Sequence, residues 1–281
     1  MLKRTITGFF IALVTIAFFL GRIFIDYRIF DILVYLSAIV GAYEITKAFS
    51  SRLTTMRKIL AIGFPVVVMP FVTFLPKYAL QIALLYSAVT VLVIIFDKTE
   101  QTENEQLNGM GLTLFSLYYP SVPLICLQLC NGALKNLSLT AILSVFLVAQ
   151  LTDVFAYFVG SLLKGKKLCP NISPNKTISG AIGGLIGGII GSVLAYYISV
   201  WCGINPFENA KTYIVIIFLA FSGIALSVVN QVGDLVESYI KRKVGIKDMG
   251  NIFPGHGGML DRVDGLSFVA VITFVIYSFL V

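Results

Sequence analysis

Charged side chains collect in one stretch of this 281-residue chain, between positions 233 and 264. Its acids are Asp234, Glu237, Asp248, Asp261 and Asp264, out of 14 acidic residues in the whole chain. On a helix, Asp234 shares a face with Glu237, and Asp261 shares one with Asp264, because residues three apart are neighbours. Hard cations such as Mg²⁺ bind one or two carboxylates together with substrate phosphates. The stretch therefore predicts a metal–polyphosphate site.

The same stretch supplies cations and a glycine-rich loop that suit phosphate groups. Ser238 and Lys241 fall on the helical face of Asp234. Between positions 250 and 258, the glycines and the proline exclude a regular helix and let backbone approach a ligand closely. His256, the only histidine, has glycines beside it and room to reach a phosphate or act as a donor. We expect it in the site; the alternative is an exposed loop residue.

A second basic cluster lies at positions 161–178 and consists of Lys164, Lys166, Lys167 and Lys176. Ser173 and Thr177 flank Lys176, and an apolar run follows them. A helix N-terminus that carries hydroxyls and a lysine favours anionic phosphate, through its free amides and its dipole. The alternative is ordinary positive charge at the membrane surface with a capping hydroxyl, and the residues alone leave both interpretations open.

Asp153 lies within an apolar run that covers 139–160. An acid inside a membrane span is a functional candidate by default, and pairing with a lysine is the structural alternative. The next apolar run carries Gly180, Gly184 and Gly188 in one stripe. Such stripes let membrane helices pack closely, which we expect here; a lipid-binding groove is the alternative.

Composition indicates what must position these residues. The chain is 58% apolar and only 12% charged, with a mean hydropathy of +0.92. These values exclude a soluble enzyme, a disordered tail and a secreted disulfide scaffold. Each helical span needs about 20 apolar residues. We therefore expect an all-α, polytopic integral membrane protein with about nine transmembrane helices, at 6–24, 29–46, 59–75, 78–96, 109–130, 139–160, 179–202, 212–232 and 265–281.

The basic residues predict the orientation of these spans. With the N-terminus in the cytoplasm, all of the 21 Lys and Arg face the cytoplasm except Arg22, Arg28, Lys77, Lys135 and Lys211. This distribution explains the net charge of +7 without a nucleic-acid partner. We expect N-terminal helices and a polar linker over 1–108, and a catalytic membrane region over 109–281 with cytoplasmic loops 161–178 and 233–264.

The residues of the last loop resemble a known signature. Ser238, Lys241 and Arg242, then Lys247-Asp248, then Pro254-Gly-His-Gly-Gly-Met-Leu-Asp-Arg-Val-Asp264 are similar to the phosphatidate cytidylyltransferases, or CDP-diacylglycerol synthases. Upstream, Asp153 with Ala156-Tyr157, Ser173-Pro174 with Lys176-Thr177, and Gly233-Asp234-Leu235 with Glu237 resemble the same family. The resemblance covers roughly 150–281, and the first 150 residues match only in their pattern of spans.

The resemblance implies transfer of CMP from CTP to phosphatidate, which gives CDP-diacylglycerol and pyrophosphate. It implies that Asp234 and Asp261 hold Mg²⁺, that Asp264 supports them, and that a second cation such as K⁺ completes the site. Lys241 and His256 join these three acids in the expected catalytic set. The expected substrate-binding residues are Asp153, Ser173, Lys176, Thr177, Ser238, Arg242, Lys247, Asp248, Gly257, Gly258 and Arg262.

The expected partners are CTP, phosphatidate, the lipid bilayer and, from the resemblance, a second copy of the chain. The expected location is a bacterial inner membrane, with the active site facing the cytoplasm. Two other classes stay open. One is a CTP-dependent enzyme with another lipid acceptor, an isoprenoid-alcohol kinase or an archaeal-type lipid cytidylyltransferase. The other is a secondary transporter, which places its charges near the midplane rather than at one face.

Overall fold

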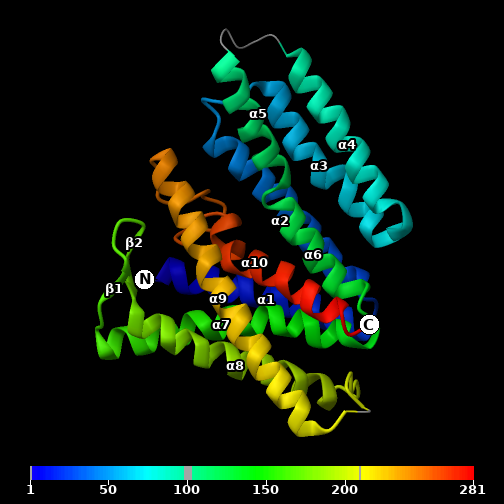
Figure 1. Ribbon diagram of the computed structural model, residues 1–281, viewed down its shortest axis with the longest axis vertical. Helices are drawn as coiled ribbons and strands as arrows, with labels where there is room; N and C mark the ends of the chain where they lie inside the picture. Colours follow the sequence, from blue (N-terminus) through cyan, green and yellow to red (C-terminus); the bar gives the residue numbers. More distant parts are fainter. Residues whose placement is uncertain (1, 98–102, 209) are drawn as a thin grey trace. The chain divides into compact units, whose positions relative to one another are not determined.

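The computed structural model describes residues 2–97, 103–208 and 210–281, and they are almost entirely α-helical (Figure 1). The elements are α1 (Leu2–Phe24), α2 (Arg28–Ala48), α3 (Thr55–Phe74), α4 (Pro76–Phe96), α5 (Glu103–Tyr118), α6 (Ser121–Gly132), the 3₁₀ turn η1 (Lys135–Leu137), α7 (Ser138–Leu163), β1 (Lys167–Cys169), β2 (Ser173–Thr177), α8 (Ile178–Trp201), α9 (Thr212–Val244) and α10 (Leu260–Ser278). The all-α prediction is confirmed. Part of the predicted polar linker, 98–102, lies outside the described residues.

Eight helical segments among the described residues are long and apolar enough to cross a membrane. They correspond to the first eight predicted spans, and the segment Asn108–Gly132 includes both the end of α5 and α6. The ninth predicted span, 265–281, corresponds to α10, which is not among the eight. The beginning of α10 carries Asp261, Arg262 and Asp264, and this 19-residue helix is too short to contain an apolar stretch of spanning length without them.

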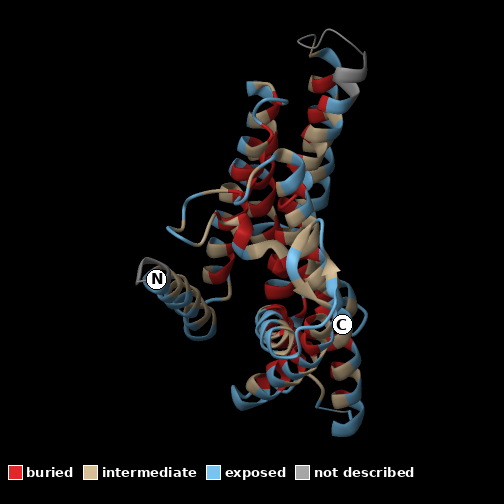
Figure 2. Cartoon of the chain, turned by 90° about the vertical axis from the view of Figure 1, so that its left-hand side faces the viewer, coloured by how far each residue is buried: buried red, intermediate tan, exposed pale blue. Residues whose placement is uncertain are grey.

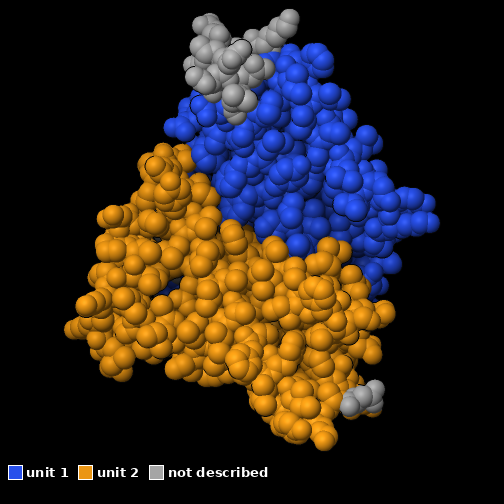
Figure 3. All heavy atoms as spheres, in the orientation of Figure 1, with its two compact units in different colours: residues 1–128, 246–262 blue, residues 129–245, 263–281 orange. Residues whose placement is uncertain are grey.

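The chain forms two compact units, drawn in different colours in Figure 3. The first unit contains residues 1–128 and 246–262. Within it, α3 packs against α2, α4 and α5, and α1 packs against α2. Phe30, Val34, Phe64 and Val68 are buried in this unit, whereas α1 presents mainly exposed or half-buried side chains. Figure 2 shows the buried stretches of the helices in red and the helix at the N-terminus in pale blue and tan.

The second unit contains residues 129–245 and 263–281, and its centre is the packing of α7, α8 and α9. The glycines of α8 explain how closely these helices approach. A β-carbon at Gly191 would lie 2.8 Å from the Leu147 carbonyl oxygen of α7, and one at Gly188 would lie 2.5 Å from Cβ of Ser227 on α9. The packing interpretation of the glycine stripe is therefore confirmed.

A short antiparallel hairpin, β1 with β2, connects α7 to α8 (Figure 1). Lys167 pairs with Thr177 and Cys169 with Ser173. At its end the Thr177 hydroxyl accepts a hydrogen bond from the Gly180 N–H at 3.1 Å, which caps the N-terminus of α8. The sequence predicted only a polar loop here, and the hairpin gives its lysines a defined backbone.

The predicted division of the chain at 108/109 stays a prediction.

Candidate functional site

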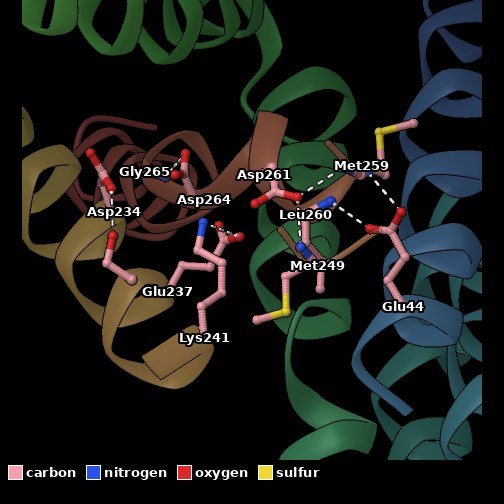
Figure 4. A network of polar contacts seen from close by, with 12 residues as sticks. Glu44, Asp234, Glu237, Lys241, Met249, Met259, Leu260, Asp261, Asp264 and Gly265 are labelled. Carbon is pink, nitrogen blue, oxygen red and sulfur yellow. Dashed lines mark hydrogen bonds and ion pairs between the residues drawn. The ribbon is translucent and has the colours of Figure 1, made fainter. Parts of the chain in front are cut away.

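Helices α9 and α10 approach each other closely at two glycines of the second unit. A β-carbon at Gly233 would lie 2.8 Å from the Phe268 ring and 3.0 Å from Cα of Gly265, and one at Gly265 would collide with the Asn230 side chain. Asp234 directly follows Gly233, and Asp264 directly precedes Gly265. The close helix contact therefore places two of the predicted site carboxylates at the same crossing, as Figure 4 shows.

The Asp234 carboxylate has a partner on each oxygen. Its Oδ2 lies 2.6 Å from Nζ of Lys176, which extends from β2, and its Oδ1 accepts a hydrogen bond from the Ser238 hydroxyl at 3.3 Å. All three residues were predicted site residues, and the structure brings them together. Both members of the ion pair remain partly accessible, with 25% and 32% of their side chains exposed. An accessible ammonium–carboxylate pair is one that a charged ligand can rearrange.

Asp264 and Asp153 add negative charge beside Asp234. Burial and then the neighbouring Asp234 carboxylate raise the pKa of Asp264, which precedes the predicted span 265–281, to about 7. Asp153 contributes to the same shift, whereas the Gly265 N–H, 2.7 Å from Asp264 Oδ1, opposes it. Asp153 Oδ1 in turn accepts a hydrogen bond from the Asn230 amide at 2.9 Å. A carboxylate whose pKa is raised by neighbouring carboxylates marks a place where a cation is favourable.

Glu237 and Lys241 form a second ion pair one turn further along α9 (Figure 4). Lys241 Nζ lies 3.2 Å from Glu237 Oε1, and the Glu237 side chain is fully buried. The positive charge of Lys241 also lowers the pKa of Asp264. The structure therefore places Lys241 at the crossing of α9 and α10, as expected for a site residue.

A pocket of about 930 Å³ opens beside the Lys176–Asp234 pair, entirely within the second unit. Its walls come from α7, the β1–β2 hairpin, the start of α8 and α9. Its charged lining residues are Asp153, Lys164, Lys167, Lys176 and Asp234. Thr177 also lines it, whereas Ser173 begins β2 and is not among the lining residues. Three lysines and two carboxylates in one pocket suit a ligand that carries several phosphates and binds with a cation.

One wall of this pocket belongs to the apolar surface of α7. Tyr157 lines the pocket and is 73% exposed, and Phe158 and Leu162 beside it on the helix are also exposed. Exposed aromatic and aliphatic side chains are typical of the surface that a membrane helix turns toward lipid. The pocket is therefore bordered by lysines on one side and by an exposed apolar surface on another.

The remaining predicted acid, Asp261, belongs to the first unit, at the start of α10. Its Oδ2 accepts hydrogen bonds from the N–H groups of Met249 and Gly258, both at 2.8 Å (Figure 4). Gly257 adopts a positive φ of 81°, and a β-carbon there would lie 2.7 Å from the same oxygen. The glycines of the signature thus let the loop close tightly around Asp261, which is buried.

The other predicted loop residues have different surroundings. The backbone N–H of His256 donates to the Phe253 carbonyl at 2.8 Å, and Nδ1 of its ring is buried without a hydrogen-bond partner in the described part of the chain. Its ring lies beside Gly8 of α1, whose neighbour Thr7 donates to the Pro254 carbonyl. The charged side chains of Arg242, Lys247, Asp248 and Arg262 are exposed. The predicted pairing of Asp234 with Asp261 joins two different units and stays a prediction.

The donor set of the second unit fits Mg²⁺. No three of the His, Cys, Asp and Glu side chains in the described residues are placed to hold one metal ion together. Magnesium requires fewer, because it binds through one or two carboxylates and completes its shell with water and substrate phosphates. Asp234 and Asp264 would supply such a pair of oxygen ligands beside a pocket lined with lysines.

The sequence did not assign three residues that lie in the pocket or beside Asp261. Lys164 and Lys167 were seen as a basic cluster but not assigned to the site, although they line the pocket. Glu44 was not singled out at all, although it is 2% exposed and accepts hydrogen bonds from Met259 and Leu260. The available signal was the presence of an acid inside the apolar run 29–46, which is a functional indication in a membrane span.

A model of the family described as the cytidylyltransferase family matches residues 3–280. The phosphatidate cytidylyltransferase of Bacillus subtilis is 30% identical over 276 residues, which are 96% of this chain and 94% of that protein. The protein of the same name from Helicobacter pylori is 30% identical over 86% of this chain and 81% of its own length. The Brucella melitensis protein is 35% identical, and the match covers 59% of this chain and 57% of that protein.

Proposed function

Because this chain belongs to the cytidylyltransferase family, we propose that it transfers CMP from CTP to phosphatidate, giving CDP-diacylglycerol and pyrophosphate. The observation that carries the proposal is the pocket at the Lys176–Asp234 pair, which combines lysines, carboxylates and an exposed apolar wall. This combination suits two phosphorylated substrates, one dissolved in water and one anchored in a bilayer. The eight apolar helices make the chain a membrane protein. We place it in a bacterial inner membrane with this pocket at the cytoplasmic face.

In the proposed reaction, a phosphate oxygen of phosphatidate attacks the α-phosphorus of CTP. A new oxygen–phosphorus bond forms, and the bond from the α-phosphorus to the oxygen of the leaving pyrophosphate breaks. The attacking phosphate monoester is already anionic near neutral pH, because comparable phosphate monoesters have a second pKa of about 6. The protein therefore needs to position and neutralise phosphates rather than remove a proton.

The lysines of the pocket have this neutralising role in the proposal. Lys176 leaves the Asp234 carboxylate to contact a substrate phosphate, and Lys164 and Lys167 contact further phosphate oxygens. Thr177 donates its hydroxyl at the N-terminus of α8, where the helix dipole also favours negative charge. Each exchange replaces one charged contact by another, so that few charges are left without partners.

Asp234 and Asp264 would hold Mg²⁺ in this proposal, and Asp153 lies close enough to Asp264 to influence its pKa. Bound Mg²⁺ would supply positive charge for the departing pyrophosphate. The roles of Asp261 as a second ligand, of K⁺ as a further cation, and of a homodimer are predictions from the sequence resemblance and stay predictions.

The decisive experiment follows radiolabelled CTP into a lipid-extractable product, with purified protein, phosphatidate and Mg²⁺. We expect labelled CDP-diacylglycerol from the wild type, and at least a hundredfold lower rate from Asp234→Asn. Product from dolichol or another isoprenoid alcohol with CTP labelled at the γ-phosphate, and none from phosphatidate with CTP labelled at the α-phosphate, would instead support the acceptor alternative. No labelled lipid with any acceptor, from protein that stays folded, would refute the proposal.

A further inference from the structure

We propose that Glu44 of α2 is a positioning residue for Asp261, and this inference rests on the proposed function. Glu44 lies in the first unit, inside the predicted apolar span 29–46, and is 2% exposed. Its Oε1 accepts the N–H of Met259 at 3.0 Å, and its Oε2 accepts the N–H of Leu260 at 2.9 Å. One buried carboxylate thus binds two consecutive amides that are more than 200 positions away in the sequence (Figure 4).

These amides belong to the N-terminus of α10, where N–H groups lack partners within the helix. Most helices satisfy them with a side chain from the preceding residues. Here the carboxylate comes from another helix and uses both oxygens, which determines the direction of the turn as well as its position. The partial positive charge of a helix N-terminus also favours a carboxylate at this place.

Asp261 follows immediately and shares the same turn. Its Oδ2 accepts the Gly258 N–H, while Glu44 accepts those of Met259 and Leu260. Three consecutive amides are therefore held by two carboxylates. A β-carbon at Gly258 would collide with the Glu44 carboxylate, and the same holds for Gly250. The backbone around Asp261 has no space to shift toward α2 while Glu44 is in place.

The chemistry of Glu44 argues for a role beyond helix packing. Burying a carboxylate inside a membrane span is costly, and an apolar side chain would suit α2 better if packing alone mattered. The hydrogen bonds that Glu44 accepts come from the turn that carries Asp261, the acid with a predicted metal-binding role. Residues that orient a metal ligand commonly change metal affinity or activity 10- to 100-fold when they are replaced.

The test combines hydrogen–deuterium exchange with the magnesium dependence of turnover. Glu44→Gln keeps the shape of the side chain and removes its charge. Glu44→Asp keeps the charge but shortens the side chain by one methylene. Asp31→Asn is the matched control, because Asp31 is also a buried acid of α2 but accepts a hydrogen bond from the Thr73 hydroxyl of α3, at 2.8 Å, and none from the described turn before α10. Exchange elsewhere in each variant monitors the fold.

We expect the amide hydrogens of Met259 and Leu260 to exchange at least tenfold faster in both Glu44 variants than in the wild type. We also expect the Mg²⁺ concentration for half-maximal turnover to rise about tenfold, with turnover restored at high Mg²⁺. Asp31→Asn should change neither quantity. Should Glu44→Gln fail to fold, Glu44→Asp carries the same comparison.

Unchanged amide exchange in folded Glu44 variants would overturn the proposal. Faster exchange with an unchanged magnesium requirement would also overturn it, because Glu44 would then be a structural cap alone. A wild type that transfers no CMP to any lipid would refute the proposed function and with it the positioning role. The exchange data would still show whether Glu44 holds the turn.

Discussion

The Lys176 ammonium lies 2.6 Å from the Asp234 carboxylate and connects β2 of the hairpin to α9. Neither residue is buried, so this pair contributes little to stability, typically below about 1 kcal/mol for exposed pairs. Its position at the pocket matters more, since it places a cation where a phosphate can displace the carboxylate.

Replacing Lys176 tests this arrangement. We expect Lys176→Met to lower turnover of CTP about 100-fold, because a hydrogen bond to a charged group is worth about 1.5–3 kcal/mol. Turnover of radiolabelled CTP into lipid measures the effect. Lys166→Met is the control, since Lys166 lies on the same connection but is exposed and does not line the described pocket. Equal losses in the two variants would contradict a specific role for Lys176.

Lys164 and Lys167 should act on substrate binding rather than on the chemical step. We expect Lys164→Met and Lys167→Met each to raise the KM for CTP about tenfold with a smaller change in kcat, because both lysines line the pocket from exposed positions. Steady-state kinetics at low and high salt measure this, and the difference from the wild type should shrink as salt screens the charges. A higher KM for phosphatidate alone would assign these lysines to the lipid substrate instead.

The close approach of α9 and α10 predicts different outcomes for two glycine substitutions. Gly265→Ala should lower the melting temperature by several degrees, because a β-carbon there collides with Asn230 and separates the helices. Gly111→Ala should leave it unchanged or raise it slightly, because nothing lies within 4 Å of a β-carbon at Gly111 and alanine favours a helix by about 0.5–1 kcal/mol. Thermal unfolding in detergent measures both. The prediction fails if the two variants melt alike.

The raised pKa of Asp264 predicts a pH-dependent cost to stability. The folded protein keeps this proton up to about pH 7, whereas the unfolded chain releases it near the ordinary value of 3.8. Stability from this group is therefore highest at low pH and decreases as the pH rises through about 7. In EDTA, Asp264→Asn should melt about 2–4 °C above the wild type at pH 8.

The same comparison at pH 5 provides the control, because the Asp264 carboxyl is then protonated in the folded protein and resembles the amide. The advantage of Asp264→Asn should shrink to less than half there, because only the unfolded chain has released the proton at pH 5. An advantage of equal size at both pH values would show that the substitution acts through packing and not through charge.

The sequence predicted the helices and several site contacts for identifiable physical reasons. Asp234 and Asp264 lie at the ends of apolar runs, and each has a glycine beside it in the sequence. Carboxylates at two helix ends could therefore be expected in one site. Lys176 could be expected near a phosphate site because it precedes a helix N-terminus. Apolar length and charge bias sufficed for these predictions, since both are local properties of the sequence.

Contacts between distant segments could not be predicted in the same way. The hydrogen bonds of Glu44 to Met259 and Leu260 depend on how α2 packs against the turn before α10, and no local pattern encodes this. The β1–β2 hairpin was missed because its segments are short and polar, with an irregular register between Lys167 and Cys169. Short strands of this kind lack the alternation that identifies a strand.

Tyr157, which lines the pocket and is also exposed on the outer surface of α7, has a kinetic consequence for the proposed lipid substrate. A head group that enters past this side chain can leave its acyl chains among neighbouring lipids throughout the reaction. Encounter between enzyme and lipid then occurs by diffusion in two dimensions. Rates should follow the mole fraction of the substrate in its bilayer or micelle, and dilution with inert detergent at constant bulk concentration should slow the enzyme.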